Sequence, residues 1–218
     1  DETAPISGTY FLPFVVEGVG RARPPDQRAG ILVLGKYQPR KNLHLMVEAI
    51  RSLTRDHDFR AVFVGECVTP EQAFVRDALR RQIETAGLNG RIELHENIPY
   101  QDMGSFYSAA SLFVLPASEE PASVAVLEAI AHGVPAICST SCGTRFYIRS
   151  GYNGMIFQSD TCEDLVRVLD TCLRDPDGLA QMSENCLDYA ARELSQDAYY
   201  DRFAAMMADR WPAEAGRW

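Results

Sequence analysis

The stretch ILVLGKYQPRKNLHLMVEAIRSL, residues 31–53, joins a short apolar run, a basic loop and an amphipathic segment. The run ILVL (31–34) is continuously apolar, which is typical of a strand covered on both faces in a parallel sheet. The apolar residues of the third part follow the 3, 4 and 7 spacing of one helix face: Leu43, Met46, Val47 and Ile50. Asn42, directly before them, is a candidate N-cap. The stretch therefore predicts a strand followed by a helix.

The same strand-then-helix pattern recurs along the chain. Further apolar, β-rich runs are AVFV (61–64), RIEL (91–94), LFVL (112–115), VPAIC (134–138) and MIF (155–157). A helix is predicted from Pro70 to about Ala86, because proline suits the first helical position, and a shorter one near 104–110. This alternation predicts right-handed βαβ units and an α/β fold, a Rossmann-like doubly wound parallel sheet.

The two ends of the chain differ from this pattern. Residues 1–29 are expected to form an extended segment and a linker, and residues 30–194 the Rossmann-like domain. Residues 195–218 are predicted to be a C-terminal helix and tail, with Tyr199, Phe203, Met206, Met207 and Trp211 on one stripe. The chain begins with Asp1 and a loop-like sequence, so we expect a piece of a longer protein.

Composition excludes several classes of protein. The 218 residues are 46% hydrophobic and 23% charged, as in ordinary globular proteins, and the net charge of −9 argues against non-specific nucleic-acid binding. The six cysteines have no metal-binding spacing, which favours reduced, mostly buried thiols in a cytoplasmic protein. No apolar run approaches the roughly 20 residues needed to cross a bilayer. We therefore expect a cytoplasmic protein, either free or peripheral at the inner face of a membrane.

Two loops are candidates for ligand binding, because ligands of open parallel sheets bind beyond the carboxyl ends of the strands. In the first, GKYQPRKN (35–42), Lys36, Arg40 and Lys41 precede a helix N-terminus, which suits a phosphate group. The alternative is a solvated basic turn, since no G-x-G-x-x-G or Walker pattern is present.

The second loop opens the stretch SEEPASVAVLEAIAHG (118–133). Ser123 is predicted to begin a helix, with Glu120 in the entering loop and Glu128 about one and a half turns in. A carboxylate in the place of Glu128 can accept hydrogen bonds from two vicinal hydroxyls, as in dinucleotide folds. The alternative is that Glu128 is ion-paired at a core edge and Glu120 is a solvated loop charge.

Together these residues resemble the nucleotide-sugar-binding half of GT-B-fold retaining glycosyltransferases of family 4, also called glycosyl transferases group 1. The resemblance covers about Ile31 to Met207. It rests on Gly35 followed by two basic residues five apart, on Glu120 and Glu128 eight apart, and on the segment LEAIAHGVP (127–135). The segments VFVGE (62–66), YSAASLFVLP (107–116) and GYNG (151–154) also fit, and all are in the expected order.

The resemblance assigns a role to each candidate residue. Following Gly35, Lys36 and Lys41 would hold the donor diphosphate, and with Glu120 they form the predicted catalytic group. Glu120 would contact hydroxyls of the transferred sugar and Glu128 the ribose, while backbone N–H groups near Ser123 and Val124 would face phosphate or sugar. The nucleobase would lie at the turn 96–98, against Asn97 and Ile98. Two positions depart from the family pattern. Lys36 replaces the usual arginine, which keeps the charge but loses bidentate hydrogen bonding, and EPAS replaces the usual E-G-F-G, so that Pro121 removes a backbone donor.

The implied reaction moves a glycosyl group from a nucleoside diphosphate sugar to an acceptor hydroxyl with retention and without a metal or cofactor. The DPD of 175–177 is interpreted as an N-cap rather than a metal motif. Two glutamates that contact different parts of one ligand do not suit a glycosidase. His95 and His132 are not assigned catalytic roles.

An N-terminal acceptor-binding domain is the expected partner, so this chain is predicted to bind donor without efficient transfer. The alternatives are a non-catalytic nucleotide-sugar-binding or scaffold module with a degenerate site, and another GT-B enzyme such as an epimerase or phosphorylase.

Overall fold

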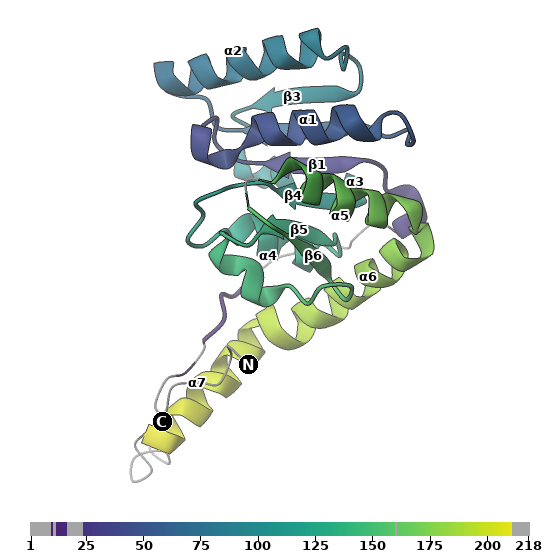
Figure 1. Ribbon diagram of the computed structural model, residues 1–218. Coiled ribbons are helices and arrows are strands. Elements are labelled where there is room, and N and C mark those ends of the chain that lie inside the picture. Colours follow the sequence, from purple (N-terminus) through teal and green to yellow (C-terminus); the bar gives the residue numbers. More distant parts are fainter. Residues whose placement is uncertain (1–9, 11, 17–23, 160, 211–218) are drawn as a thin grey trace.

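The computed structural model of the protein describes residues 10, 12–16, 24–159 and 161–210. Its centre is one parallel sheet with the strand order β3-β2-β1-β4-β5-β6 (Figure 1). The strands are β1 (Ile31–Leu34), β2 (Ala61–Gly65), β3 (Ile92–Glu96), β4 (Leu112–Leu115), β5 (Ala136–Ser139) and β6 (Gly154–Phe157). The order reverses between β1 and β4, which is where open α/β sheets form their ligand crevice. The predicted Rossmann-like doubly wound fold is confirmed.

The predicted strands agree closely with those observed, with one informative shift. β1 and β4 have the predicted bounds, whereas β5 begins two residues later than the run VPAIC suggests. The cause is the turn that precedes it: the Val134 amide donates to the Ala129 carbonyl at 2.8 Å and closes the preceding helix. Val134 is fully buried, but it belongs to the end of that turn and not to the strand.

Helices cover both faces of the sheet (Figure 1). They are α1 (Leu43–Leu53), α2 (Pro70–Thr85), α3 (Met103–Ala109), α4 (Val124–Ala131), α5 (Cys162–Arg174), α6 (Pro176–Tyr189) and α7 (Gln196–Arg210). On one face, α1, α2 and α5 form a core with residues such as Met46, Ile50 and Phe63. On the other face, α3, α4 and α6 form a second core around residues such as Phe113 and Leu127. The sheet is therefore buried on both sides, as its apolar strands require.

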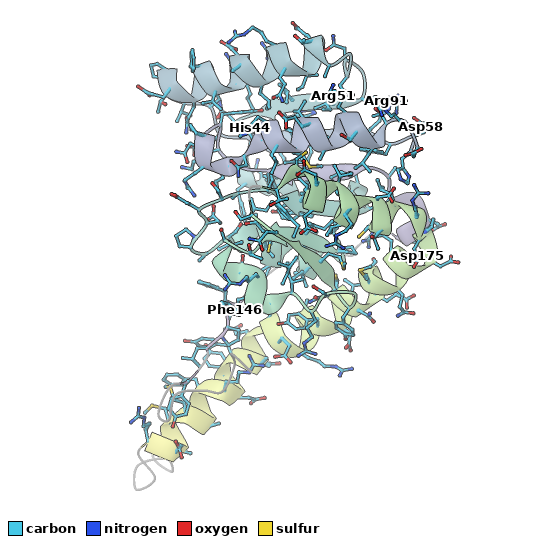
Figure 2. All side chains as sticks on the ribbon, in the orientation of Figure 1. His44, Arg51, Asp58, Arg91, Phe146 and Asp175 are labelled. Atoms are coloured by element: carbon cyan, nitrogen blue, oxygen red, sulfur yellow. The ribbon has the colours of Figure 1, made fainter. Side chains whose placement is uncertain are left out.

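Two helix starts test the predicted caps. Asp175 accepts a hydrogen bond from the Gly178 amide at 2.9 Å with Pro176 in the first turn, so the predicted cap of α6 is confirmed. Figure 2 places Asp175 on the same side of the molecule as Asp58 and Arg91, which precede β2 and β3, and therefore away from the carboxyl edge of the sheet. Asn42 does occupy the N-cap of α1, but in the left-handed region (φ 50°) and without a capping side-chain hydrogen bond.

The last helix, α7, extends away from the sheet. A π-helical turn η5 (Ala190–Leu194) connects α6 to α7, which extends away from the body of the molecule and has no buried residue (Figure 1). Trp211 of the predicted stripe lies outside the described residues. Of the predicted extended segment, residues 12–16 have no regular secondary structure, and the Val16 amide donates to the Leu194 carbonyl at 3.0 Å.

All six cysteines carry free thiols, and four of them are buried. Within the parts of the chain that the structure describes, the longest apolar helical segments are too short to span a bilayer.

Candidate functional site

A cavity of about 440 Å³ lies at the carboxyl ends of β1, β2 and β3. Four of the predicted site residues line it, namely Gly35, Lys36, Asn97 and Ile98. The rest of its wall is Leu34, Val64, Gly65, Glu66, Val68 and Met103. The predicted convergence of the loop after β1 with the turn after β3 is therefore observed, and it encloses a space with both apolar and charged walls.

Lys36 has a partner in this cavity that the sequence did not reveal. Its Nζ lies 2.9 Å from the Glu66 carboxylate, and the two side chains are 50% and 41% exposed. Hydrogen bonds from Lys36 and then from Gln72 lower the pKa of Glu66. Gln72 is buried and donates to Glu66 at 3.3 Å, while its Oε1 accepts from the amides of Val68 and Thr69 at the start of α2. The loop after β2 is thus anchored to α2 while its carboxylate faces Lys36.

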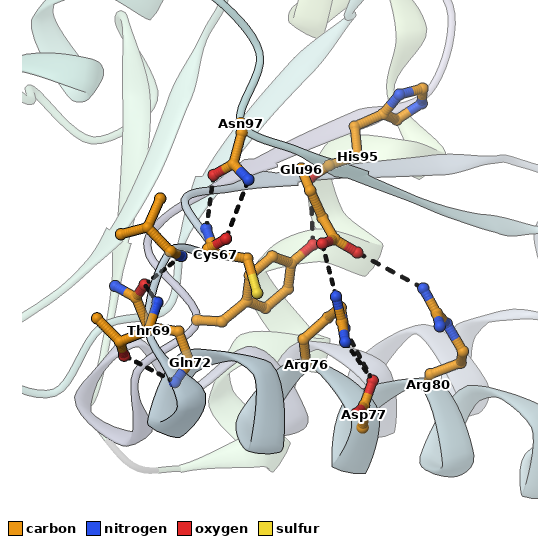
Figure 3. Close-up of polar contacts among 11 residues, drawn as sticks. Cys67, Thr69, Gln72, Arg76, Asp77, Arg80, His95, Glu96 and Asn97 are labelled. Carbon is orange, nitrogen blue, oxygen red and sulfur yellow. Dashed lines mark hydrogen bonds and ion pairs between the residues drawn. The ribbon is translucent and has the colours of Figure 1, made fainter.

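Asn97 holds the turn after β3 against the loop after β2 (Figure 3). Its Oδ1 accepts from the Cys67 amide at 2.8 Å, and its Nδ2 donates to the Cys67 carbonyl at 3.0 Å. Asn97 is in the left-handed region (φ 53°), which asparagine tolerates better than most residues. The preceding Glu96 pairs with Arg76 at 2.7 Å. Both polar side chains of this turn are therefore engaged within the protein, so the turn presents mainly backbone and Ile98 to the cavity.

Lys41 and Glu120 form a buried ion pair, although they are 79 residues apart. Each residue is only 8% exposed. Arg40 adds a second contact to the Glu120 carboxylate at 3.2 Å and donates to the Glu119 carbonyl at 2.6 Å. Gly35 makes room for this arrangement, because a Cβ at that position would lie 3.2 Å from the Lys41 side chain. The predicted catalytic residues Lys41 and Glu120 are thus in direct contact.

The loop that carries Glu120 is fixed by a close backbone approach. The Gly143 amide donates to the Glu120 carbonyl at 2.7 Å. A Cβ on Gly143 would lie 1.8 Å from the Pro121 carbonyl oxygen, which is far inside contact distance. Only glycine fits here, so the turn after β5 determines where the Glu120 loop lies. No pattern in the sequence indicated this role for Gly143.

The start of α4 has the predicted form. Ser123 is its N-cap residue, is buried and makes no side-chain capping bond, while Val124 in the first turn is 47% exposed. The first amides of a helix have no partner within the helix. Such amides can donate hydrogen bonds to an anion, and anion binding by the amides near Ser123 and Val124 stays a prediction.

Glu128 is bound by two tyrosines that the sequence analysis missed. The Tyr100 hydroxyl donates to Oε1 at 2.9 Å and the Tyr107 hydroxyl donates to Oε2 at 2.7 Å. Tyr107 belongs to the quoted segment YSAASLFVLP, but nothing in its spacing indicates contact with α4. In the sequence Tyr100 lies between Ile98 and Met103, both of which line the cavity, whereas Glu128 is not among the residues of its wall.

The two histidines near the sheet differ in position. His132 ends α4, and its Nδ1 is 2.8 Å from the Glu128 carbonyl while its ring stacks on Tyr107. His95 contacts Phe106 edge-to-face and lines a separate cavity with Arg60 and Glu93. His132 thus helps to hold α4 against α3, and His95 faces away from the cavity that Lys36 lines.

Residues 20–190 match the sequence pattern of the family described as glycosyl transferases group 1. The chain belongs to this family. The resemblance drawn from the loop after β1, the paired glutamates and the following helix is therefore confirmed.

Curated relatives of this glycosyl transferases group 1 member are enzymes of different specificities. The lipopolysaccharide core biosynthesis glycosyltransferase LpsE of Rhizobium meliloti is 24% identical over 89% of this chain and 55% of its own length. A D-inositol 3-phosphate glycosyltransferase of Thermobispora bispora is 27% identical over 78% of this chain and 40% of its own. The chain thus spans about half the length of the curated relatives it matches.

Solved structures confirm the fold of this family member. The C-terminal domain of a glycosyl transferase group 1 family protein (LpcC) from Francisella tularensis superposes with a TM-score of 0.71 at 20% identity. That match covers 85% of this chain and 97% of the other. Anabaena Alr3699/HepE, solved in complex with UDP, superposes with a TM-score of 0.73 at 20% identity over 85% of this chain and 50% of its own. The chain therefore has the fold of that C-terminal domain.

Proposed function

We propose that this chain is the donor-binding domain of a retaining glycosyltransferase, which moves a sugar from a nucleoside diphosphate sugar to an acceptor hydroxyl. The observation that carries the proposal is the convergence of Lys36, the Lys41–Glu120 pair and Glu128 around one edge of the sheet in a member of this family. A relative of the same fold was solved with UDP, which supports a nucleoside diphosphate as the ligand class.

The role proposed for each residue follows from the exposure and charge of its side chain. Lys36 is half exposed and would exchange Glu66 for a diphosphate, while the amides near Ser123 and Val124 would supply further donors. Glu128 would accept the ribose hydroxyls, and the base would lie against Ile98 and the backbone of Asn97. Glu120, oriented by Lys41, would face hydroxyls of the transferred sugar.

Departure of the diphosphate builds negative charge, and fixed cations and helix amides lower the cost of that charge. In this proposal Lys36, Lys41 and the N-terminus of α4 stabilise the leaving group, and neither a metal nor a cofactor is required. Acceptor recognition is assigned to an N-terminal domain in the parent protein, so the isolated chain would bind donor and transfer sugar poorly.

Thermal stabilisation by UDP, GDP, ADP and TDP tests the proposal. A ligand at about 100 times its dissociation constant stabilises by about 2.7 kcal/mol, which raises Tm by about 5–11 °C for a chain of this size. One diphosphate should do so, and Glu128→Ala should abolish the shift. Glu119→Ala is the matched control, because Glu119 is an exposed carboxylate in the loop that precedes α4. If no diphosphate raises the Tm, donor binding by this chain is refuted.

A second candidate is a nucleotide-sugar-binding module that does not turn over. It is favoured by the engagement of Glu120 with both Lys41 and Arg40 and by Pro121, which offers no amide to a sugar. The two functions differ in what the sugar contributes to binding. In a donor site, Glu120→Gln should weaken binding of the nucleotide sugar relative to the free diphosphate. In a degenerate site, the variant should affect both ligands equally.

A further inference from the structure

The carboxylate of Glu128 lies between two tyrosine hydroxyls of opposite exposure. Tyr107, which donates to Oε2, is 2% exposed, whereas Tyr100, which donates to Oε1, is 78% exposed. One side of the carboxylate therefore faces the protein core and the other faces solvent. The two hydrogen bonds look equivalent by distance, but their surroundings differ completely.

Tyr107 is fixed from several sides. Its ring stacks on His132 with centroids 4.9 Å apart and lies 6.1 Å from the ring of Phe113. His132 is in turn hydrogen-bonded to the backbone of Glu128 at 2.8 Å, so α3 and α4 are joined at two points. Burial, followed by the charge of Glu128, raises the pKa of Tyr107 well above its ordinary value of 10. Tyr107 thus remains a hydrogen-bond donor at any physiological pH.

Tyr100 is held by little besides this hydrogen bond. It begins the short 3-10 turn η3 (Tyr100–Asp102), which has no buried residue. It follows Ile98 by two residues and precedes Met103 by three, and both of these line the 440 Å³ cavity. The Tyr100 hydroxyl therefore lies on the solvent side of the Glu128 carboxylate, which is the side open to a ligand hydroxyl.

We infer that the two tyrosines have different roles: Tyr107 is a positioning residue that fixes the carboxylate, and Tyr100 is a placeholder that gives way to a ribose hydroxyl. The exchange replaces one neutral O–H donor by another, so no proton moves and the carboxylate keeps its hydrogen bonds. The inference rests on the proposed function, in which Glu128 accepts the ribose. It also assigns a specificity: a nucleotide without ribose hydroxyls cannot replace Tyr100, so it forms no hydrogen bond with Glu128 and binds more weakly.

The test is calorimetric titration of the 218-residue chain with UDP and with 2′,3′-dideoxy-UDP. The variants are Tyr100→Phe and Tyr107→Phe, each of which removes one hydroxyl and keeps the ring. Tyr152→Phe is the control, because the Tyr152 hydroxyl bonds Asp188 at 3.2 Å, away from Glu128. If another diphosphate of the thermal panel binds better, that nucleotide and its dideoxy analogue are used in the same way.

The expected results separate the two tyrosines. Tyr107→Phe should weaken UDP binding about ten-fold while changing the dideoxy affinity little, because a hydrogen bond to a charged group that orients the carboxylate is lost. Tyr100→Phe should leave UDP affinity unchanged or tighten it by up to about ten-fold, because a competing hydrogen bond to the charged group is removed. Tyr152→Phe should change neither.

Two results would overturn the inference. If Tyr107→Phe weakens both ligands equally, Tyr107 acts only on the fold. If Tyr100→Phe weakens UDP as strongly as Tyr107→Phe does, Tyr100 contacts the ligand or holds Glu128 and does not give way. In either case binding of UDP by the wild type and its loss in Glu128→Ala would leave the proposed function standing. Absence of any binding by the wild type would instead refute the proposed function, and this inference with it.

Discussion

Replacing Lys41 by methionine should destabilise this protein far more than the loss of an ordinary surface lysine. Methionine keeps most of the length of the side chain but leaves Glu120, a residue that is 8% exposed, without the closest partner of its carboxylate. Removing one partner of a buried ion pair typically costs about 3–5 kcal/mol. Here Arg40 remains at 3.2 Å, but its side chain is 39% exposed and compensates only in part. We therefore expect a loss of about 2–3 kcal/mol in the free energy of unfolding.

Urea denaturation followed by circular dichroism measures this loss, and a double-mutant cycle identifies its source. The set is wild type, Lys41→Met, Glu120→Gln and the double variant. Because the double variant leaves no buried charge unpaired, its cost should be smaller than the sum of the single costs by about 1 kcal/mol or more. A cost below about 0.5 kcal/mol for Lys41→Met, or additive single costs, would refute the buried pair as described.

Three further predictions follow from single contacts. Gly143→Ala should destabilise by about 1–3 kcal/mol in urea unfolding, because its Cβ would meet the Pro121 carbonyl oxygen; wild-type stability would contradict the close approach. Glu66→Gln should release Lys36 and tighten UDP binding about two- to five-fold by calorimetry, with unfolding changed by less than about 0.5 kcal/mol; weaker binding would assign Glu66 to the ligand. The folded pKa of Tyr107 is raised, so its stabilising contribution is fully present below about pH 10 and is lost as the pH rises further. Between pH 8 and 11 the free energy of unfolding, measured in urea, should therefore fall less steeply with pH in Tyr107→Phe than in the wild type. Equal slopes in the two proteins would show that the pKa of this tyrosine is the same in the folded and unfolded chain.

The strands could be predicted because they are buried on both faces. ILVL and LFVL are continuous apolar runs, and both have the observed bounds of β1 and β4. A run of that kind has few other stable positions in a soluble protein. The start of β5 could not be found in this way, since Val134 is equally apolar and equally buried but closes the turn after α4. Apolar character reports burial, and it does not distinguish a strand from the turn before it.

Only those features of the candidate site that follow from the strand topology could be predicted from the sequence. Residues that follow parallel strands meet at one edge of the sheet, which is sufficient to bring Gly35 and Lys36 to Asn97 and Ile98. The partners of the charged groups depend on side-chain packing between elements distant in sequence. The contact of Tyr107 with Glu128 is set by how α3 lies on α4, and no periodicity within either helix encodes it.

In this structure every charge that the proposed donor would use already has a partner in the protein, so binding is an exchange of partners and not a simple addition. The exposed fractions decide which exchanges are easy. The side chains of Lys36 and Glu66 are 50% and 41% exposed, and a pair of that kind contributes at most about 1 kcal/mol, so a diphosphate can displace Glu66 at little cost. Lys41 and Glu120 are nearly excluded from water, and separating them would leave both charges unpaired. In the proposed diphosphate site, Lys36 therefore exchanges Glu66 for the diphosphate, while Lys41 stays paired with Glu120. Under this proposal a lysine in place of the family's usual arginine suits the first position, because a side chain that must leave one carboxylate and reach a phosphate gains more from flexibility than from the fixed geometry of a guanidinium.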